Sequence, residues 1–199
     1  MEFVRTPDER FLDLEDYDFE PKYRSITAAD GTSLRFHFVD EGPRDSAPVL
    51  LLHGNPTWSY LHRSMIRGLA QRGHRVVALD LMGMGRSDKP TNSSDYSLAN
   101  HIDWMSQWLE GEDLTNITLY CQDWGGIFGL TLPMAAPQRF TRLLVMNTTL
   151  ATGATSPGFK AWRDYSNSQP DLAVGKLLKR GKRDLPDAEA AGYDAPFPD

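Results

Sequence analysis

The sequence predicts an α/β protein with a mostly parallel sheet, and two patterns in the chain support this prediction. Between residues 49 and 149, short apolar runs alternate with segments of helical character, the order in which right-handed crossovers place parallel strands side by side. Ahead of that region, two strand-like segments at 22–29 and 33–40 flank Asp30-Gly31, a dipeptide typical of a hairpin turn. We therefore expect an antiparallel hairpin at one edge of the sheet.

Four apolar runs are the candidate core strands. The first of them is continuous rather than alternating, as expected of a strand that is covered on both faces. The runs are VLLLHG at 49–54, HRVVALDL at 74–81, NITLYCQD at 116–123 and RLLVMNTT at 142–149. The helices predicted to follow the first three runs cover 58–72, 97–109 and 125–136, and Pro137 is expected to stop the last of them.

The alternation of strands and helices stops near residue 150. Beyond it, several prolines separate short helix-like pieces, which indicates an inserted subdomain instead of further sheet. We divide the chain into an irregular lead-in at 1–21, a partial α/β core at 22–150 and a partial helical cap at 151–199.

The composition limits the classes of partner. A net charge of −6 disfavours nucleic acid and anionic membranes, and the chain has no run of about 18 apolar residues that could span a bilayer. Cys121 is the single cysteine, so an intrachain disulfide is impossible and a reducing, cytoplasmic location is expected. We predict neither a cofactor nor a metal.

CQDWGG at 121–126 has the spacing of a nucleophile elbow, a sharp turn from a strand into a helix. Cys121, Gly125 and Gly126 lie two before, two after and three after Asp123, where larger side chains would clash. The turn would raise residue 123 above the carboxyl ends of the strands, where open α/β sheets place their sites. Asp123 could instead only cap the following helix; the small residues around it favour a nucleophile.

An aspartate nucleophile selects the reaction. A serine that attacks a saturated carbon would leave an ether, whereas a carboxylate leaves an ester that water can cleave. A carboxylate is also charged at neutral pH and needs no base for the first step. We expect Asp123 to displace a leaving group from an alkyl carbon, and this excludes an ordinary serine esterase.

HGNP at 53–56 follows the first parallel strand, where this type of fold supplies one backbone N–H to an oxyanion hole. The residue after the nucleophile supplies the other, so the predicted donors are the N–H groups of Asn55 and Trp124. We assign His53 a structural hydrogen bond within the loop instead of a catalytic role.

Three segments together resemble one known family. HGNPTWSYLHRSMI at 53–66, ALDLMGMGRSDKP at 78–90 and LYCQDWGGIFGL at 119–130 are similar to the haloalkane dehalogenases, a family of α/β-hydrolases. The resemblance covers about residues 20 to 199. It implies hydrolytic cleavage of a carbon–halogen bond through an alkyl-enzyme ester on Asp123, which gives an alcohol and a halide.

The resemblance also implies a halide site built from two side-chain N–H donors. Trp124 matches the first donor. The second is a cap tryptophan in one subfamily, matched by Trp162 in FKAW at 159–162, or the loop asparagine in another, matched by Asn55; this chain has both. Phe159 is a candidate pocket wall.

The base and acid that complete such a site are not evident. All five histidines (His37, His53, His62, His74 and His101) precede Asp123, whereas in this fold the histidine follows the nucleophile and the acid. Asn147 stands where one subfamily has a glutamate. The other subfamily, with the acid after the strand beyond the cap, would place it after Asp199. We expect a chain of that subfamily truncated within its cap, without the C-terminal strands and with doubtful turnover.

Two other readings stay open. An epoxide hydrolase also uses an aspartate, and Tyr165 and Tyr193 could hold its substrate oxygen, although its loop usually has an aromatic residue in place of Asn55. An inactive fragment that binds a small apolar ligand is the non-enzyme alternative. The partners expected for a dehalogenase are a small haloalkane, water and halide, and we expect a monomer if the protein is complete.

Overall fold

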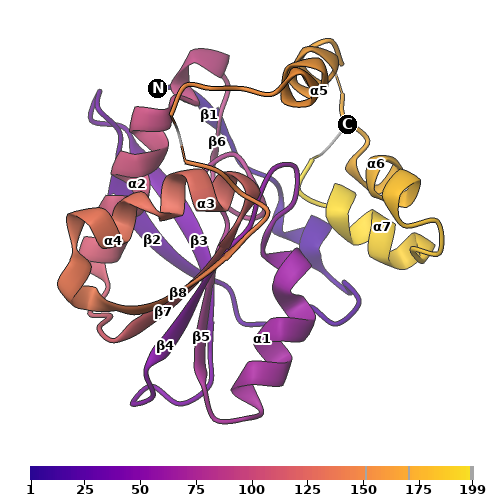
Figure 1. The fold of residues 1–199 in the computed structure, drawn as a ribbon. Coiled ribbons are helices and arrows are strands. Elements are labelled where there is room, and N and C mark those ends of the chain that lie inside the picture. Colours follow the sequence, from indigo (N-terminus) through magenta and orange to yellow (C-terminus); the bar gives the residue numbers. More distant parts are fainter. Residues whose placement is uncertain (151, 170, 198–199) are drawn as a thin grey trace.

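A six-stranded sheet runs through the centre of the computed structural model, which describes residues 1–150, 152–169 and 171–197 (Figure 1). The strand order is β2-β3-β5-β4-β7-β8. The four strands from β5 to β8 pair in parallel, as the alternating pattern predicts. The strands are β2 (Lys22–Thr27), β3 (Ser33–Glu41), β4 (Pro48–Leu52), β5 (Arg75–Leu79), β7 (Ile117–Gln122) and β8 (Phe140–Met146).

The predicted hairpin forms one edge of this sheet. β2 and β3 are antiparallel, with Lys22 opposite Phe38 and Thr27 opposite Ser33. The turn between them places Gly31 at φ +86°, a conformation that glycine adopts without steric cost. β3 also pairs antiparallel with β5, so the hairpin joins the parallel strands at that edge.

Helices cover both faces of the sheet, with α2, α3 and α4 on one face and α1 on the other (Figure 1). The core helices are α1 (Arg63–Ala70), α2 (Leu98–Gly111), α3 (Asp123–Gly129) and α4 (Thr131–Ala135), and the 3-10 turns are η1 (Asp8–Phe11), η2 (Ser59–His62), η3 (Ser93–Asp95) and η4 (Pro137–Arg139).

Two of the helices differ from the expected ranges. The segment predicted as one helix over 58–72 begins as the 3-10 turn η2 and becomes α-helical only at Arg63. The segment predicted over 125–136 begins two residues earlier, at Asp123, and divides at Leu130 into α3 and α4. Pro133 explains the division, because its ring lacks an N–H for the carbonyl of Gly129 and clashes with that carbonyl.

The side chains of β4 show why its sequence is continuously apolar. Leu50 and Leu52 pack in a cluster with Trp104 and Trp108 of α2. Leu51 points the other way and packs with residues that include Ile66 of α1 and Trp58. Alternate side chains of a strand face opposite sides, so both faces of β4 are buried against helices.

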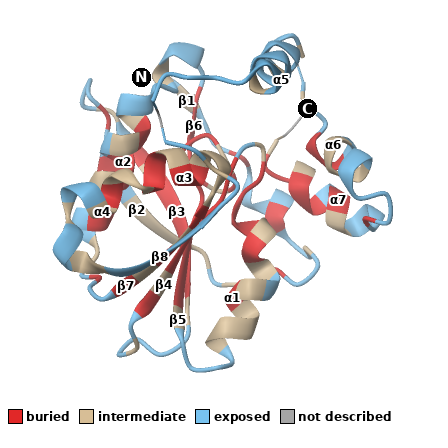
Figure 2. Ribbon diagram, viewed as in Figure 1, coloured by how far each residue is buried: buried red, intermediate tan, exposed pale blue. Residues whose placement is uncertain are grey.

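The first and last parts of the chain meet on one side of the core. β1 (Phe3–Val4) pairs with β6 (Lys89–Pro90), and Thr6 Oγ1 donates to the carbonyl of Pro196 at 2.7 Å. The cap helices are α5 (Pro157–Asn167), α6 (Val174–Gly181) and α7 (Asp187–Asp194). α7 turns a buried face toward the core, whereas α5 is almost wholly exposed (Figure 2).

β8 has one strand neighbour, β7, among the residues that the structure describes. Its apolar side chains are about half exposed, at Leu143, Leu144, Val145 and Met146. An unpaired apolar edge of this kind can pair with other chains. Within the same residues, no helix is long and apolar enough to cross a membrane.

Candidate active site

Asp123 lies at the junction of β7 and α3, at the carboxyl end of a central parallel strand. Its φ is +51°, in the left-handed region that aspartate enters more readily than most residues but that still costs about 1–3 kcal/mol. Backbone strain of this kind is maintained only when neighbouring contacts enforce it.

Glycines make room for this turn. A Cβ on Gly125 would overlap the carbonyl oxygen of His53, and a Cβ on Gly126 would overlap the side chain of Thr148. A Cβ on Gly54 would overlap the carboxyl group of Asp123 itself. Gly125 and Gly126 are therefore required by the close approach of α3 to the end of β4 and to the segment after β8.

The Asp123 carboxylate is held by a distant loop instead of capping its own helix. The backbone N–H of Asn55 donates to Asp123 Oδ1 at 2.9 Å. The main chain of Asp123 is fixed from the other side, because its carbonyl accepts from Thr148 Oγ1 at 2.6 Å and its N–H donates to the carbonyl of Asn147 at 3.2 Å. The N-cap position of α3 is Gln122, which makes no side-chain capping bond.

Trp124 occupies the first turn of α3, where helix N–H groups have no acceptor within the helix. Its backbone N–H therefore has no acceptor within the helix, and its role as the second oxyanion donor stays a prediction. The ring of Trp124 packs against Phe128, with 5.3 Å between the ring centroids.

His53 has the structural role that the sequence analysis assigns to it. Its Nε2 accepts the backbone N–H of Leu81 at 2.9 Å, so the proton is on Nδ1, which donates to the carbonyl of Gly54 at 2.9 Å. The ring is fully buried, and this burial lowers the pKa of His53. Both ring nitrogens are engaged in shaping the loop that carries Asn55.

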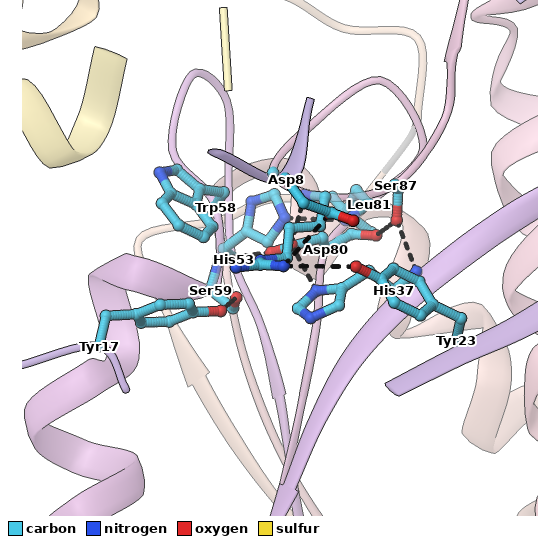
Figure 3. Close-up of polar contacts among 12 residues, drawn as sticks. Asp8, Tyr17, Tyr23, His37, His53, Trp58, Ser59, Asp80, Leu81 and Ser87 are labelled. Carbon is cyan, nitrogen blue, oxygen red and sulfur yellow. Dashed lines mark hydrogen bonds and ion pairs between the residues drawn. The ribbon is translucent and has the colours of Figure 1, made fainter. Parts of the chain in front are cut away.

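The buried residue Asp80 forms hydrogen bonds with several segments of the chain behind the site (Figure 3). Asp80 accepts from Nδ1 of His37 at 2.7 Å and from the backbone N–H groups of Ser59 and Arg86, both at 2.8 Å. Burial alone would raise the pKa of Asp80, but His37, His53 and the backbone N–H of Arg86 hold it well below its usual range. A Cβ on Gly85 would overlap the Asp80 carboxylate, so the close approach of this loop to Asp80 requires a glycine at position 85.

An apolar cavity of about 180 Å³ adjoins the site. Asn55 and Trp124 contribute to its lining, as do Met82, Met84 and Phe128. The cavity thus brings together two of the three candidate halide donors.

His101 and Tyr96 also line this cavity, and the sequence analysis gave neither a role there. The His101 ring stacks on Phe128 at 4.3 Å, and burial lowers its pKa to about 4. The sequence did contain a sign of the position of His101. It is a polar residue on the apolar face of α2, which it shares with Trp104, Met105 and Trp108.

The cap places its two candidate site residues differently. Phe159 of α5 lies beside Trp124, with 6.3 Å between the ring centroids. Trp162, one turn further, is 37% exposed and packs against Tyr165 of the same helix. The structure therefore brings Phe159 to the site and leaves Trp162 at the surface.

The remaining histidines, in the described part of the chain, make no hydrogen bond to the Asp123 carboxylate. His62 is buried and its ring meets Tyr120 edge-on at 5.5 Å, and His74 is exposed beyond α1. Within residues 1–150, 152–169 and 171–197, no group of three or more His, Cys, Asp or Glu side chains could hold a metal ion.

Comparison with known proteins places these features in context. Residues 47–181 match the family model for the alpha/beta hydrolase fold. The chain is 48% identical to a haloalkane dehalogenase of Psychrobacter cryohalolentis, over all of this chain and 67% of that protein. It is 42% identical to the structure of the haloalkane dehalogenase DpaA from Paraglaciecola agarilytica NO2, described as tetrameric, with a TM-score of 0.93 over all of this chain and 67% of that one.

An epoxide hydrolase is a more distant neighbour. The structure of VrEH1 from Vigna radiata has a TM-score of 0.68 and 21% identity, over 89% of this chain and 67% of that one. Similarity at this level reflects a shared fold.

Proposed function

Because this chain belongs to the haloalkane dehalogenase family of α/β-hydrolases, we propose that Asp123 attacks the halogen-bearing carbon of a small haloalkane. The hydrogen bond from Asn55 to Oδ1 distinguishes the two carboxylate oxygens. Oδ2 is the oxygen that attacks, with its electron pair forming the new C–O bond as the C–X pair leaves with the halide.

The departing halide needs donors that bind an anion without adding a full charge. The indole N–H of Trp124 supplies one, and the side-chain amide of Asn55 is the second donor that we favour, because both residues line the 180 Å³ cavity. Trp162 remains an alternative only if α5 moves, since its ring packs at the surface against Tyr165. Neutral donors in an apolar pocket hold a halide and still release it.

The second step cleaves the ester at its carbonyl carbon. Water adds there, and negative charge develops on Oδ1, which already accepts from the N–H of Asn55. When this intermediate collapses, the Cγ–Oδ2 bond breaks, the alcohol leaves with Oδ2, and the oxygen from water completes the carboxylate. Preorganised donors at the position of developing charge are worth about 3–4 kcal/mol each in comparable sites. The backbone N–H groups of Asn55 and Trp124 are thus our proposed oxyanion hole.

That water requires a general base, which works best with a pKa near the working pH. His53 uses both ring nitrogens in structural bonds. His101 lines the cavity, but burial lowers its pKa to about 4, which makes it a weak base. We infer that the 199-residue chain forms the alkyl ester and hydrolyses it slowly.

The proposal rests on one observation about Asp123. Its backbone is in the left-handed conformation, and its Oδ1 accepts a hydrogen bond from the Asn55 N–H. Incubation of the chain with 1,2-dibromoethane and separately with styrene oxide, followed by intact-mass spectrometry, tests it. We expect one bromoethyl adduct, mapped to Asp123 by peptide sequencing. The variant Asp123→Asn is the control, because asparagine tolerates the same φ and lacks the nucleophilic charge. An adduct from the epoxide alone would overturn the proposal.

Within the described part of the chain, neither candidate tyrosine makes a contact that favours the epoxide hydrolase alternative. Tyr165 is exposed on α5. Tyr193 is buried and its ring packs edge-on against Tyr60 at 5.1 Å, away from the residues that line the 180 Å³ cavity. Neither tyrosine is placed to hold a substrate oxygen beside Asp123.

Two expectations about the complete protein remain proposals. A monomer is the first, and light scattering after size-exclusion chromatography would overturn it by showing a tetramer, as described for the Paraglaciecola protein. The second is a cytoplasmic location, which fractionation of the source cells would test.

A further inference from the structure

Two cavities meet beside the nucleophile. The inner cavity is the apolar one of about 180 Å³ that contains Trp124 in its wall. The outer cavity measures about 610 Å³ and lies between the cap and the core, with Val174 of α6 and Phe197 in its wall. Among the residues that the structure describes, only Asn55 and Met84 line both of them.

Met84 also lies where the two hydrophobic clusters of the core meet. Its side chain packs against the cluster that contains Phe128 and against the cluster that contains Val174. The first of these residues belongs to the wall of the inner cavity and the second to the wall of the outer cavity. The Met84 side chain is therefore the apolar partition between the two spaces.

The backbone under this partition is fixed. Met84 stands between Gly83 at φ +88° and Gly85 at φ +50°. Its N–H donates to the carbonyl of Leu81 at 2.8 Å, and its carbonyl accepts from the N–H of Ser87 at 3.1 Å. Its unbranched thioether side chain has three rotatable bonds, so the side chain can change position while the loop does not.

We propose that Met84 sets the chain length of the haloalkane that Asp123 accepts, an inference that rests on the proposed function. The inner cavity, at about 180 Å³, is smaller than the roughly 300–1,000 Å³ of most ligand sites, and suits a substrate of few carbons. A longer alkyl chain has to pass Met84 and extend into the outer cavity. The volume and mobility of residue 84 then decide how well long substrates are alkylated relative to short ones.

The experiment compares bromoethane with 1-bromohexane. The rate of single alkylation of Asp123 is measured by intact-mass spectrometry for each substrate, and the ratio of the two rates is the readout. We expect Met84→Ala to raise the rate for 1-bromohexane relative to that for bromoethane by about tenfold or more. This is the discrimination that a few methylenes give in an apolar pocket. Met84→Phe should lower this relative rate by a similar factor, and the volume-conserving Met84→Leu should keep it within about twofold.

Met134→Ala is the matched control. Met134 is an exposed methionine of α4 and lines neither cavity, so its variant should keep the wild-type ratio. Circular dichroism reports whether each variant is folded; if Met84→Ala unfolds, the Phe and Leu variants decide the question.

The outcomes separate the two proposals. If the wild-type chain is alkylated but the folded Met84→Phe variant keeps the wild-type ratio of rates, the proposed role of Met84 in substrate length is overturned. The proposed function then stands. If neither bromoalkane alkylates the wild-type chain, the proposed function fails, and the inference fails with it.

Discussion

The backbone N–H of Asn55 donates to Oδ1 of Asp123 across a separation of 68 residues in the chain. The bond joins the loop after β4 to the turn after β7, and β4 and β7 are neighbours in the sheet. It directs Oδ1 toward a donor, and Oδ2 is the oxygen to which our proposal assigns the attack. Two predictions test this site, and two more test the stability of the fold around it.

Gly54→Ala should disable the nucleophile. The added Cβ would overlap the Cβ and carboxyl group of Asp123, and displacement of a reacting group by about 1 Å can cost about a hundredfold in rate. We expect the rate of Asp123 alkylation by 1,2-dibromoethane to fall by about that factor. Gly158→Ala is the control, because the nearest atom to its Cβ is Ser156 Oγ at 3.9 Å. Wild-type rates in folded Gly54→Ala would show that this contact does not matter.

Asn55→Ala should weaken halide binding, and Trp162→Phe should not. The alanine variant keeps the backbone N–H to Asp123 but loses an amide that lines the cavity; loss of one hydrogen bond to an anion should raise the Kd by about tenfold. Trp162 is at the surface. A bromide titration monitored by tryptophan fluorescence measures the Kd of both variants. The reverse result would assign the second halide donor to the cap tryptophan.

His62→Phe should protect the fold in acid. Neither ring nitrogen of His62 has a hydrogen-bond partner among the described residues, and burial lowers its pKa from 6.5 to about 3. The unfolded chain therefore binds a proton that the folded chain rejects, so this contribution to stability is complete above pH 6.5 and is lost as the pH falls toward 3. From pH 7.5 to 5.0 the loss is about 2 kcal/mol.

Urea unfolding at pH 7.5 and 5.0 measures this difference. His62→Phe should lose about 2 kcal/mol less than wild type between the two pH values, because phenylalanine has no group to protonate. His74→Gln is the control, since His74 is exposed. Equal acid sensitivity in wild type and His62→Phe would contradict the prediction.

Glu189→Ala should loosen α7 from the core. Glu189 Oε1 is 2.8 Å from Nη2 of Arg63, and the two side chains are only 17% and 11% exposed. The cost of leaving Arg63 unpaired should be about 1–3 kcal/mol, between the values for surface and buried pairs. Limited proteolysis of residues 186–197 and urea unfolding measure it. Asp164→Ala breaks the exposed pair with Lys160 and should cost less than about 0.5 kcal/mol; equal effects would show that α7 does not depend on its pair.

The amino-acid sequence by itself determined the local elements and the tight turn at Asp123. The continuous apolar run at 49–54 marked a buried parallel strand, because both faces of β4 are covered. Gly125 and Gly126 beside Asp123 marked the elbow, because a tight turn excludes larger side chains there for steric reasons that act between near neighbours. The helix division at Leu130 was also readable in principle, since Pro133 imposes it locally.

Only the tertiary structure decided which distant residues meet. The pairing of β1 with β6, the bond from Asn55 to Asp123, the exposure of Trp162 and the place of Met84 between two cavities all depend on strand order and on how the cap packs against the core. Local periodicity shows which face of an element is buried, but not which other element covers it. That choice is made by the summed packing of side chains far apart in the chain, and no short segment of sequence contains it.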